Sequence, residues 1–491
     1  MPELLALLPI LILTLCMVGL GWSAASAGMA GAAMAILVAV ATFDYATDLI
    51  ALAGPLLEAG FTAATILWII FPALALHELQ TSTGAAERMS LSLASITNEP
   101  IARLLILAWF LALLMEGAAG FGTPVALIAP MLVGIGYPPA KALLLALVGH
   151  AAGVSFGAVG TPVMALLELS PQDPHQLSFA IMVLHLALGW TLVQVLSHIS
   201  GCRLSKKNSL IPPLAAVCFL LPATLLAWLT GPELPTLGGA MLGGAIFVGI
   251  AKWLWRAEDA DTGRTQDGLM RALLPYILIL VAMLATRIVP TLAVSLQSFV
   301  LEWEIAGRFG GLAKPLYHPG TMLMLALAGV ALVQKDSRAH MLPALGKAAR
   351  RLPSVALALV SVLFLSGIMV HSGMIATLAA SSAAIFGGIW PIAVPFIGAL
   401  GSFITGSATS SNILFGNFQL TAAETVGLAP LLALAGQGFG AGIGNIIAPH
   451  NIVAGAATVG LMGREGAVLK STLPICLGYT AAGGLLLLAL A

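Results

Sequence analysis

Apolar stretches follow one another along this chain, and most of them are long enough to cross a lipid bilayer as a helix of about 20 residues. Hydrophobic residues make up 59% of the 491 residues and charged residues only 8%. We therefore predict an all-α integral membrane protein with about 12–14 transmembrane segments. Candidate spans lie near residues 4–22, 28–53, 60–79, 101–115, 176–200, 211–229, 236–255, 272–290, 319–334, 354–371, 385–400 and 471–490.

Charge and motif patterns argue against several other classes of protein. The 20 basic and 20 acidic residues give no net charge, so a nucleic-acid partner is not expected. The four cysteines stand singly, without the CxxC spacing of zinc sites. A GxSxG match at residues 153–157 lacks the preceding strand that a nucleophile elbow requires. We expect no metal, no cofactor and no enzymatic activity.

Two further apolar regions, 116–165 and 405–462, are interrupted by Gly, Pro, Ser, Thr and Asn at matching intervals. His150 precedes Pro162 by the same number of positions as Gln437 precedes Pro449. Paired interruptions of this kind indicate an internal repeat of a secondary transporter, here predicted to be inverted, with broken helices or re-entrant hairpins. We divide the chain into an N-terminal repeat (1–200), a central segment (201–350) and a C-terminal repeat (351–491).

Backbone that leaves the helix inside a bilayer must face protein or a watery cavity, because unpaired N–H and C=O groups in lipid are costly. The two interrupted regions are therefore predicted to meet in mid-membrane and to line a polar chamber. Glycine can also serve only for close helix packing, which is the interpretation we favour for Gly239 and Gly243. Packing alone does not explain Pro, Asn and Thr clustered twice at equal spacing.

Basic residues predict the orientation, because Lys and Arg in short loops stay cytoplasmic. One group comprises Arg203, Lys206 and Lys207, and another lies between residues 335 and 351. Pairs of spans separate these groups from the basic stretch 252–271, so all three are expected on the cytoplasmic side. Arg287, at the end of a span, is expected to extend toward the lipid headgroups.

Ionisable side chains inside apolar segments are costly, and they are functional candidates by default. Glu116 lies at the first interruption, and His150 occupies the repeat position that matches Gln437. We predict that Glu116 and His150 take part in proton coupling, since both groups can exchange protons. The alternatives are a Glu116 permanently paired with Arg or Lys and a His150 that only packs. His185 and His371 are interpreted as structural.

An anionic substrate needs positive potential, which the N-termini of half-helices supply through unpaired N–H groups. Such termini are expected within residues 120–123 and 405–412, where Thr and Ser hydroxyls add donors. The predicted substrate-binding residues are Gly120, Gly122, Thr123, Thr405, Ser407, Thr409, Ser410, Ser411, Asn412 and Gln437. Arg103 and Lys141 flank the first region and are further candidates.

The first interruption reads EGAAGFGTPVA from Glu116 and resembles the signature of the lactate permease family. Residues 156–162, 405–407, 409–415 and 449–463 resemble further pieces of that family in the same order. The resemblance extends almost end to end, although residues 200–350 match only in hydropathy. It implies a multi-pass carrier of the bacterial inner membrane that imports lactate or glycolate with protons. It also implies two inverted halves, re-entrant hairpins and elevator-like movement.

Four positions depart from the pattern of that family. Ala408 and Asn445 stand where the family usually has Asp and Lys, and His150 and Gln437 stand where it usually has Asn. The chain is therefore interpreted as a diverged member.

The leading hypothesis for function is proton-coupled symport of small monocarboxylates such as L-lactate, D-lactate and glycolate. Sodium coupling through oxygens at the second interruption is an alternative, and a passive anion channel is a third. The expected partners are a small carboxylate anion, a proton or Na⁺, and membrane lipid. The sequence leaves the oligomeric state open, with a homodimer among the options.

Overall fold

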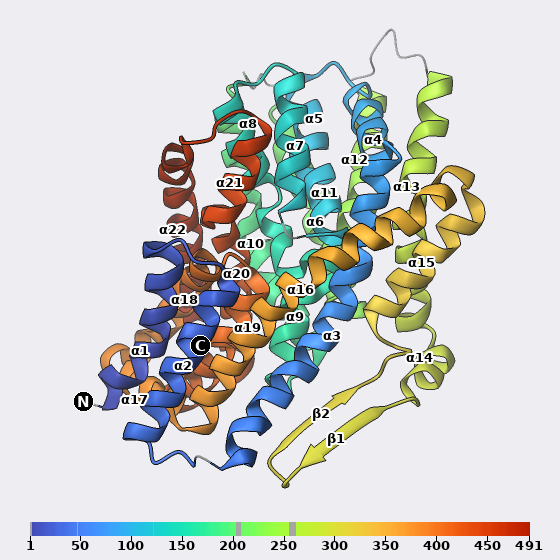
Figure 1. The fold of residues 1–491 in the computed structure, drawn as a ribbon. Coiled ribbons are helices and arrows are strands. Elements are labelled where there is room, and N and C mark those ends of the chain that lie inside the picture. The colour runs from blue at the N-terminus through green and yellow to red at the C-terminus, as the bar shows by residue number, and fades with distance from the viewer. Residues whose placement is uncertain (1, 47, 121, 203–207, 255–261) are drawn as a thin grey trace.

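Helices form nearly all of the regular structure in a computed structural model that describes residues 2–46, 48–120, 122–202, 208–254 and 262–491 (Figure 1). Within those residues, twelve helices are long and apolar enough to cross a membrane, or up to thirteen if the bent pair Pro139–Gly149 and Ala151–Leu167 counts as one span. The prediction of a helical, multi-pass membrane protein is confirmed. One small exception is an antiparallel hairpin of β1 (Leu301–Ile305) and β2 (Phe309–Ala313).

The elements follow one another in three groups along the chain. The first 200 residues form α1 (Pro2–Thr14), η1 (Leu15–Gly19), α2 (Ala24–Thr42), α3 (Leu49–Ser82), α4 (Ala85–Ala94), α5 (Pro100–Leu105), η2 (Ile106–Leu111), α6 (Ala112–Ala118), α7 (Thr123–Gly134), α8 (Pro139–Gly149), η3 (Ala151–Phe156), α9 (Gly157–Leu167) and α10 (Pro174–Ser200). The middle of the chain adds α11 (Ile211–Thr230), α12 (Pro235–Leu254), α13 (Thr262–Ile288), α14 (Pro290–Gln297), α15 (Pro319–Val333) and α16 (Lys335–His371). The last part contains α17 (Met374–Phe386), η4 (Gly387–Ile389), α18 (Trp390–Thr405), α19 (Ala408–Val426), α20 (Pro430–Gly444), η5 (Asn445–Ile447), α21 (Pro449–Thr458) and α22 (Glu465–Leu490).

The predicted boundary between the second and third spans is wrong. Helix α3 begins at Leu49, inside the predicted second span, and continues for 34 residues. Asp44 adopts a positive φ of 50°, and the Asp48 side chain caps α3 by accepting the Ala51 N–H at 2.7 Å. These polar turn residues end one helix and start the next, although apolar residues surround them on both sides.

Helices α11 and α12 pack closely at the two glycines that were predicted to serve packing. A Cβ on Gly239 would lie 2.8 Å from the Ala223 Cβ, and a Cβ on Gly243 would overlap the Cys218 carbonyl oxygen. Small residues let helix backbones approach in this way. The packing interpretation of these glycines is confirmed.

Arg287 is buried, which corrects the prediction that it extends toward the headgroups. Its guanidinium donates to Glu233 Oε1 at 2.8 and 3.1 Å and stacks over the Tyr317 ring at 3.7 Å. The Arg287 and Glu233 side chains are only 2% and 6% exposed. Glu233 lies in the turn before α12, and its opposite charge compensates the desolvation of the guanidinium.

The helices that carry the two interruptions lie at the centre of the molecule. In the apolar 18-residue stretch of Pro100–Ala118, 94% of the residues are buried, and the share is 83% for Pro430–Thr458 against 22% for Pro2–Gly19. Outer helices such as α1 leave apolar side chains exposed for lipid. The polar breaks are thus enclosed by protein.

The two interrupted regions repeat one order of elements. In the first region, a break separates α6 from α7, a short turn follows, and η3 separates α8 from α9. In the second region, a break separates α18 from α19, a short turn follows, and η5 separates α20 from α21. The regions also pack on each other, because α7 contacts α21 and α9 contacts α19. Figure 1 shows α7 and α8 in the upper part of the molecule and α19 in the lower part.

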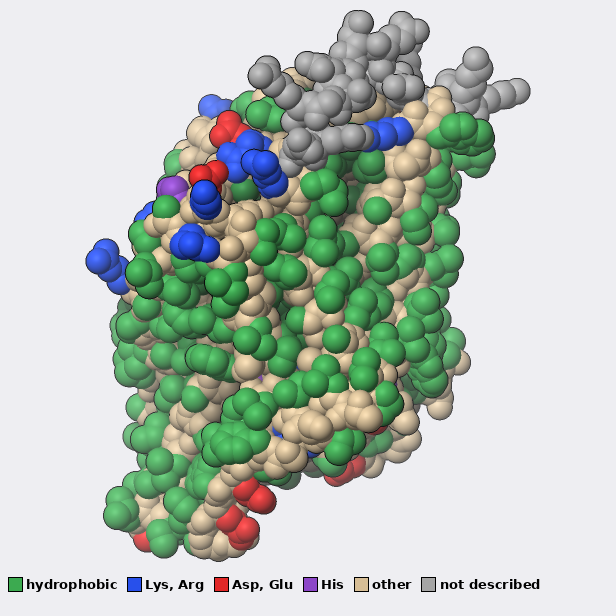
Figure 2. Space-filling model, turned by 90° about the vertical axis from the view of Figure 1, so that its right-hand side faces the viewer, with side chains coloured by type: hydrophobic (Ala, Val, Ile, Leu, Met, Phe, Trp, Pro, Cys, Tyr) green, Lys and Arg blue, Asp and Glu red, His purple; other side chains and the backbone are tan. Residues whose placement is uncertain are grey.

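Charged side chains separate toward the two ends of the bundle. Figure 2 shows Lys and Arg gathered near the upper end of one face, with some Asp and Glu among them, whereas the charged side chains at the lower end are mainly Asp and Glu. This separation agrees with the predicted orientation, although Arg203, Lys206 and Lys207 lie outside the described residues.

Candidate functional site

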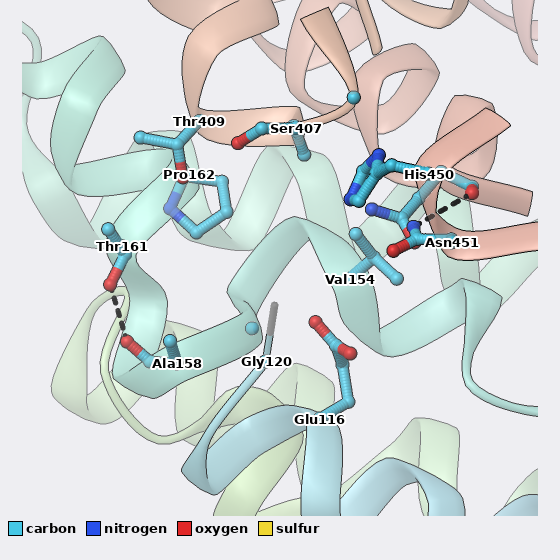
Figure 3. Close-up of a pocket in the computed structure, with 14 residues that line it drawn as sticks. Glu116, Gly120, Val154, Ala158, Thr161, Pro162, Ser407, Thr409, His450 and Asn451 are labelled. Carbon is cyan, nitrogen blue, oxygen red and sulfur yellow. Dashed lines mark hydrogen bonds between the residues drawn. The ribbon is translucent and has the colours of Figure 1, made fainter. Parts of the chain in front are cut away.

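A cavity of about 250 Å³ lies where the two interrupted regions meet (Figure 3). Its wall combines elements far apart in the sequence: α6, η3 and α9 from the first region, and α19, η5 and α21 from the second. The lining residues are Glu116, Gly120, Val154, Gly157, Ala158, Thr161, Pro162, Gly406, Ser407, Ala408, Thr409, Asn445, His450 and Asn451.

Glu116 lies on the last turn of α6, directly before the chain leaves the helix. Its side chain is buried, with 4% exposed. Gly157 at the start of α9 leaves room for this carboxylate, because a Cβ there would overlap Glu116 Oε1. Among the described residues no Lys, Arg or His forms an ion pair with Glu116. Within that part of the chain, the alternative of a Glu116 permanently paired with a basic residue has no support.

The start of α9 is strained where it borders the cavity. Ala158 and Val159 have φ values of 44° and 53°, in the left-handed region that L-residues rarely adopt. Gly160 follows with a φ of 80°, and the Thr161 hydroxyl donates to the Ala158 carbonyl at 2.6 Å. The regular helical part of α9 therefore begins after Gly160, at the cavity wall.

Helix α19 also begins at the cavity. Ser407 caps it, accepting the Ser410 N–H at 3.3 Å, and Ala408 and Thr409 of the first turn line the wall. Gly406, with a φ of 76°, turns the chain sharply between α18 and α19. The first N–H groups of a helix have no partner within the helix, so this end offers donors toward the cavity.

Helix α21 contributes a third N-terminus. It starts at Pro449 after the 3-10 turn η5, and His450 and Asn451 of its first turn line the wall. The Asn451 Nδ2 donates to both the carbonyl oxygen and the side-chain Oδ1 of Asn445, at 3.1 and 2.5 Å. Figure 3 shows His450 and Asn451 on one side of the cavity, Glu116 below them, and Ser407 and Thr409 above.

Four predicted residues line this cavity: Glu116, Gly120, Ser407 and Thr409. A second cavity of about 550 Å³ reaches Thr405 and Ser410. It shares Gly406, Ser407, Thr409 and His450 with the first cavity, so these residues stand between the two spaces.

Three predicted residues, Ser411, Asn412 and Gln437, lie behind the wall. Gln437 is fully buried and donates to Ser411 Oγ at 3.2 Å and to Asn412 Oδ1 at 3.4 Å. Asn412 in turn donates to the Pro162 carbonyl at 2.9 Å, which joins the two halves. Gly122 and Thr123 start α7 beside the cavity without lining it.

His150 is also buried behind the wall but contacts a residue that lines it. Its Nε2 lies 3.3 Å from Asn445 Oδ1, and its Nδ1 lies 2.9 Å from the Ala146 carbonyl oxygen. Two positions that depart from the resembled family pattern, 150 and 445, are thus in contact. A third, Ala408, lines the same cavity as Asn445. Gln437, the fourth, lies in the separate buried network described above.

Sequence reasoning missed His450 and Asn451 as wall residues. The signal was available, because Pro449 matches Pro162 in the repeat and Pro162 borders the first interruption. Arg103 and Lys141, the basic candidates, do not line the cavity. The Lys141 ammonium donates instead to the Ser200 carbonyl at 2.8 Å.

Comparison with known proteins gives consistent matches. A family model described as L-lactate permease matches residues 3–491. An L-lactate permease of Streptococcus iniae is 32% identical over 379 residues, covering 74% of this chain and 79% of its own. A glycolate permease of Escherichia coli is 27% identical, covering 99% of this chain and 95% of its own. The Alcanivorax borkumensis YdaH transporter shares the fold, with a TM-score of 0.50 at 17% identity over 89% of this chain and 86% of its own.

Proposed function

The chain belongs to the L-lactate permease family, and we propose that it carries small monocarboxylates of the lactate and glycolate class across the bacterial cytoplasmic membrane together with protons. The acids named for its relatives, L-lactate and glycolate, are both small 2-hydroxy monocarboxylates. The 250 Å³ cavity at the centre of the bundle is the proposed binding site.

The observation that carries this proposal is the convergence of three helix starts on one cavity. The first turns of α19 and α21 and the resumed helix of α9 all line it. Each helix N-terminus is equivalent to roughly half a positive charge. No Lys or Arg of the described chain lines the cavity, so these N-termini and the adjacent hydroxyls supply the positive potential for a carboxylate.

Glu116 supports the coupling to protons. A substrate carboxylate and an ionised Glu116 would repel each other strongly in a cavity shielded from water, because the Coulomb energy rises as the dielectric constant falls. Uptake of a proton by Glu116 removes this repulsion, so the anion and the proton bind together. His150 adds a second exchangeable group, one residue behind the wall at Asn445.

The proposal includes two inverted halves that move relative to each other. A two-fold axis in the membrane plane would exchange α7 with α19 and α9 with α21. Such an exchange converts the contact of α7 with α21 into the contact of α19 with α9, and both contacts are present. Alternating exposure of a site between such repeats is the common mechanism of secondary transporters.

Transport by the purified protein in proteoliposomes tests the proposal. An inward proton gradient should drive accumulation of radiolabelled L-lactate and glycolate, without any requirement for sodium. Accumulation that depends on sodium and ignores pH would replace protons by Na⁺ as the coupling ion. Fast flux without accumulation under either gradient would indicate a channel and contradict coupled transport.

A further inference from the structure

Asn451 presents a buried hydrogen-bond acceptor without a partner at the cavity. The residue is fully buried, and its Oδ1 has no hydrogen-bond partner within the described structure. Most buried polar atoms are hydrogen-bonded, so an exception in a cavity wall indicates that a bound ligand supplies the missing partner.

The orientation of this amide is determined by its neighbours. The Asn451 Nδ2 donates to the Asn445 carbonyl oxygen, a group that can only accept, so the nitrogen must face Asn445 and the oxygen must face away from it. Figure 3 shows this arrangement, with the dashed bond leaving the Asn451 nitrogen. Gly122 leaves room for the oxygen, since a Cβ there would lie only 2.7 Å from Oδ1.

An acceptor in this position requires a donor from the ligand, and a carboxylate has none to give. Two hydroxyls of the wall already have a partner within the protein: Thr161 Oγ1 donates to the Ala158 carbonyl, and Ser407 Oγ accepts from the Ser410 N–H. The 2-hydroxyl group of lactate or glycolate supplies one donor next to the carboxylate. The first turn of α19 and Asn451 line the same cavity.

We propose that Asn451 is a specificity-determining residue, which accepts a hydrogen bond from the 2-hydroxyl group of the substrate while the helix N-termini hold its carboxylate. This inference rests on the proposed function and assigns to Asn451 the selection of 2-hydroxy monocarboxylates over acids that lack the hydroxyl. A site built to bond a hydroxyl rejects analogues that lack it, because its own buried group is then left unpaired.

Substrate analogues test the proposal on the unmodified protein in proteoliposomes. Propionate lacks the 2-hydroxyl, and 2-oxopropionate has an oxygen there but no donor. Both should compete with radiolabelled L-lactate about tenfold more weakly than unlabelled L-lactate does, which corresponds to one lost hydrogen bond. Equal competition by all three acids would overturn the proposal without any variant.

A matched pair of variants locates the effect at Asn451. Asn451→Ala should reduce the preference for L-lactate over propionate to within about twofold, by weakening the binding of L-lactate alone. Gln419→Ala is the control, because Gln419 Oε1 is also buried without a partner but lies away from the cavity. It should retain the full preference.

The outcomes separate this inference from the proposed function. An unchanged preference in Asn451→Ala, or an equal loss for both acids, contradicts the role of Asn451 and leaves monocarboxylate transport standing. If the unmodified protein carries none of these acids, the proposed function itself fails. If Asn451→Ala does not fold, equal competition by the three acids on the unmodified protein still overturns the inference.

Discussion

The Glu116 side chain fits at the cavity because nearby positions of the chain are glycine. Gly157 leaves the volume that the carboxylate fills, and Gly120 turns the backbone away directly after α6 with a φ of 58°. A carboxylate in such a place is costly to keep charged, and an ionisable group inside an apolar segment is a candidate for function.

Replacement of this carboxylate by an amide tests for such a function. Glu116→Gln keeps the shape of the side chain but cannot switch between a charged and a protonated form, so proton-driven accumulation of L-lactate should be lost. Exchange of labelled for unlabelled L-lactate should continue, because it needs no net proton movement. Both can be measured in the same proteoliposomes.

Glu424→Gln provides the comparison, since Glu424 is exposed on α19. It should accumulate L-lactate like the unmodified protein. Normal proton-driven accumulation by Glu116→Gln would remove Glu116 from the coupling mechanism.

At the scale of elements, the strained start of α9 is held by a turn from another part of the chain. The turn between α11 and α12 lies against Gly160 so closely that a Cβ there would overlap the Pro232 carbonyl oxygen. Thr236 donates to the Gly153 carbonyl at 2.7 Å. Residues 232–236 thus support both sides of the break that forms the cavity wall.

Alanine at Gly160 should therefore destabilise the protein by more than backbone strain alone. The left-handed conformation costs an L-residue about 1–2 kcal/mol, and the overlap with Pro232 adds to this cost. Gly136→Ala separates the two contributions, because Gly136 also has a positive φ, of 102°, but no atom lies within 4 Å of a Cβ there. Thermal unfolding in detergent should show a larger drop for Gly160→Ala, and equal drops would refute the supporting role of the turn.

At the scale of the whole molecule, a buried ion pair connects that turn to the bundle. Glu233 follows Pro232 in the turn, and Arg287 comes from the end of α13. The Arg287 Nη2 also donates to the Tyr317 carbonyl at 2.9 Å, in the segment before α15. Three separate parts of the chain meet at one guanidinium.

Loss of this guanidinium should be costly. Arg287→Met leaves Glu233 buried without a counter-charge, for which a loss of about 3–5 kcal/mol in the free energy of unfolding is typical. The double variant Arg287→Met with Glu233→Gln should recover part of the loss, because no buried charge remains. Arg464→Met, at an exposed position, should change stability by less than about 0.5 kcal/mol. An equal change in the free energy of unfolding for Arg287→Met and Arg464→Met would show that the ion pair contributes little to stability.

Much of the architecture was readable from residue order alone. Long apolar runs determine which segments enter the lipid, and the equal spacing of the two interruptions predicted that they would come together. Glu116, Gly120, Ser407 and Thr409 were selected for that reason and line one cavity. His150 and Gln437 were assigned to the site by the same repeat but lie behind its wall, because the repeat matches positions along the chain and not the directions of side chains.

Local composition and residue order are enough to predict that this protein lies in a membrane, where its polar breaks occur and which family it resembles. The packing of the helices, in contrast, brings three helix starts to one cavity, leaves the Asn451 Oδ1 of its wall buried without a partner, and buries Arg287 against Glu233. These features depend on contacts between residues distant in the sequence, such as Asn412 with Pro162, and such contacts form only when the helices pack.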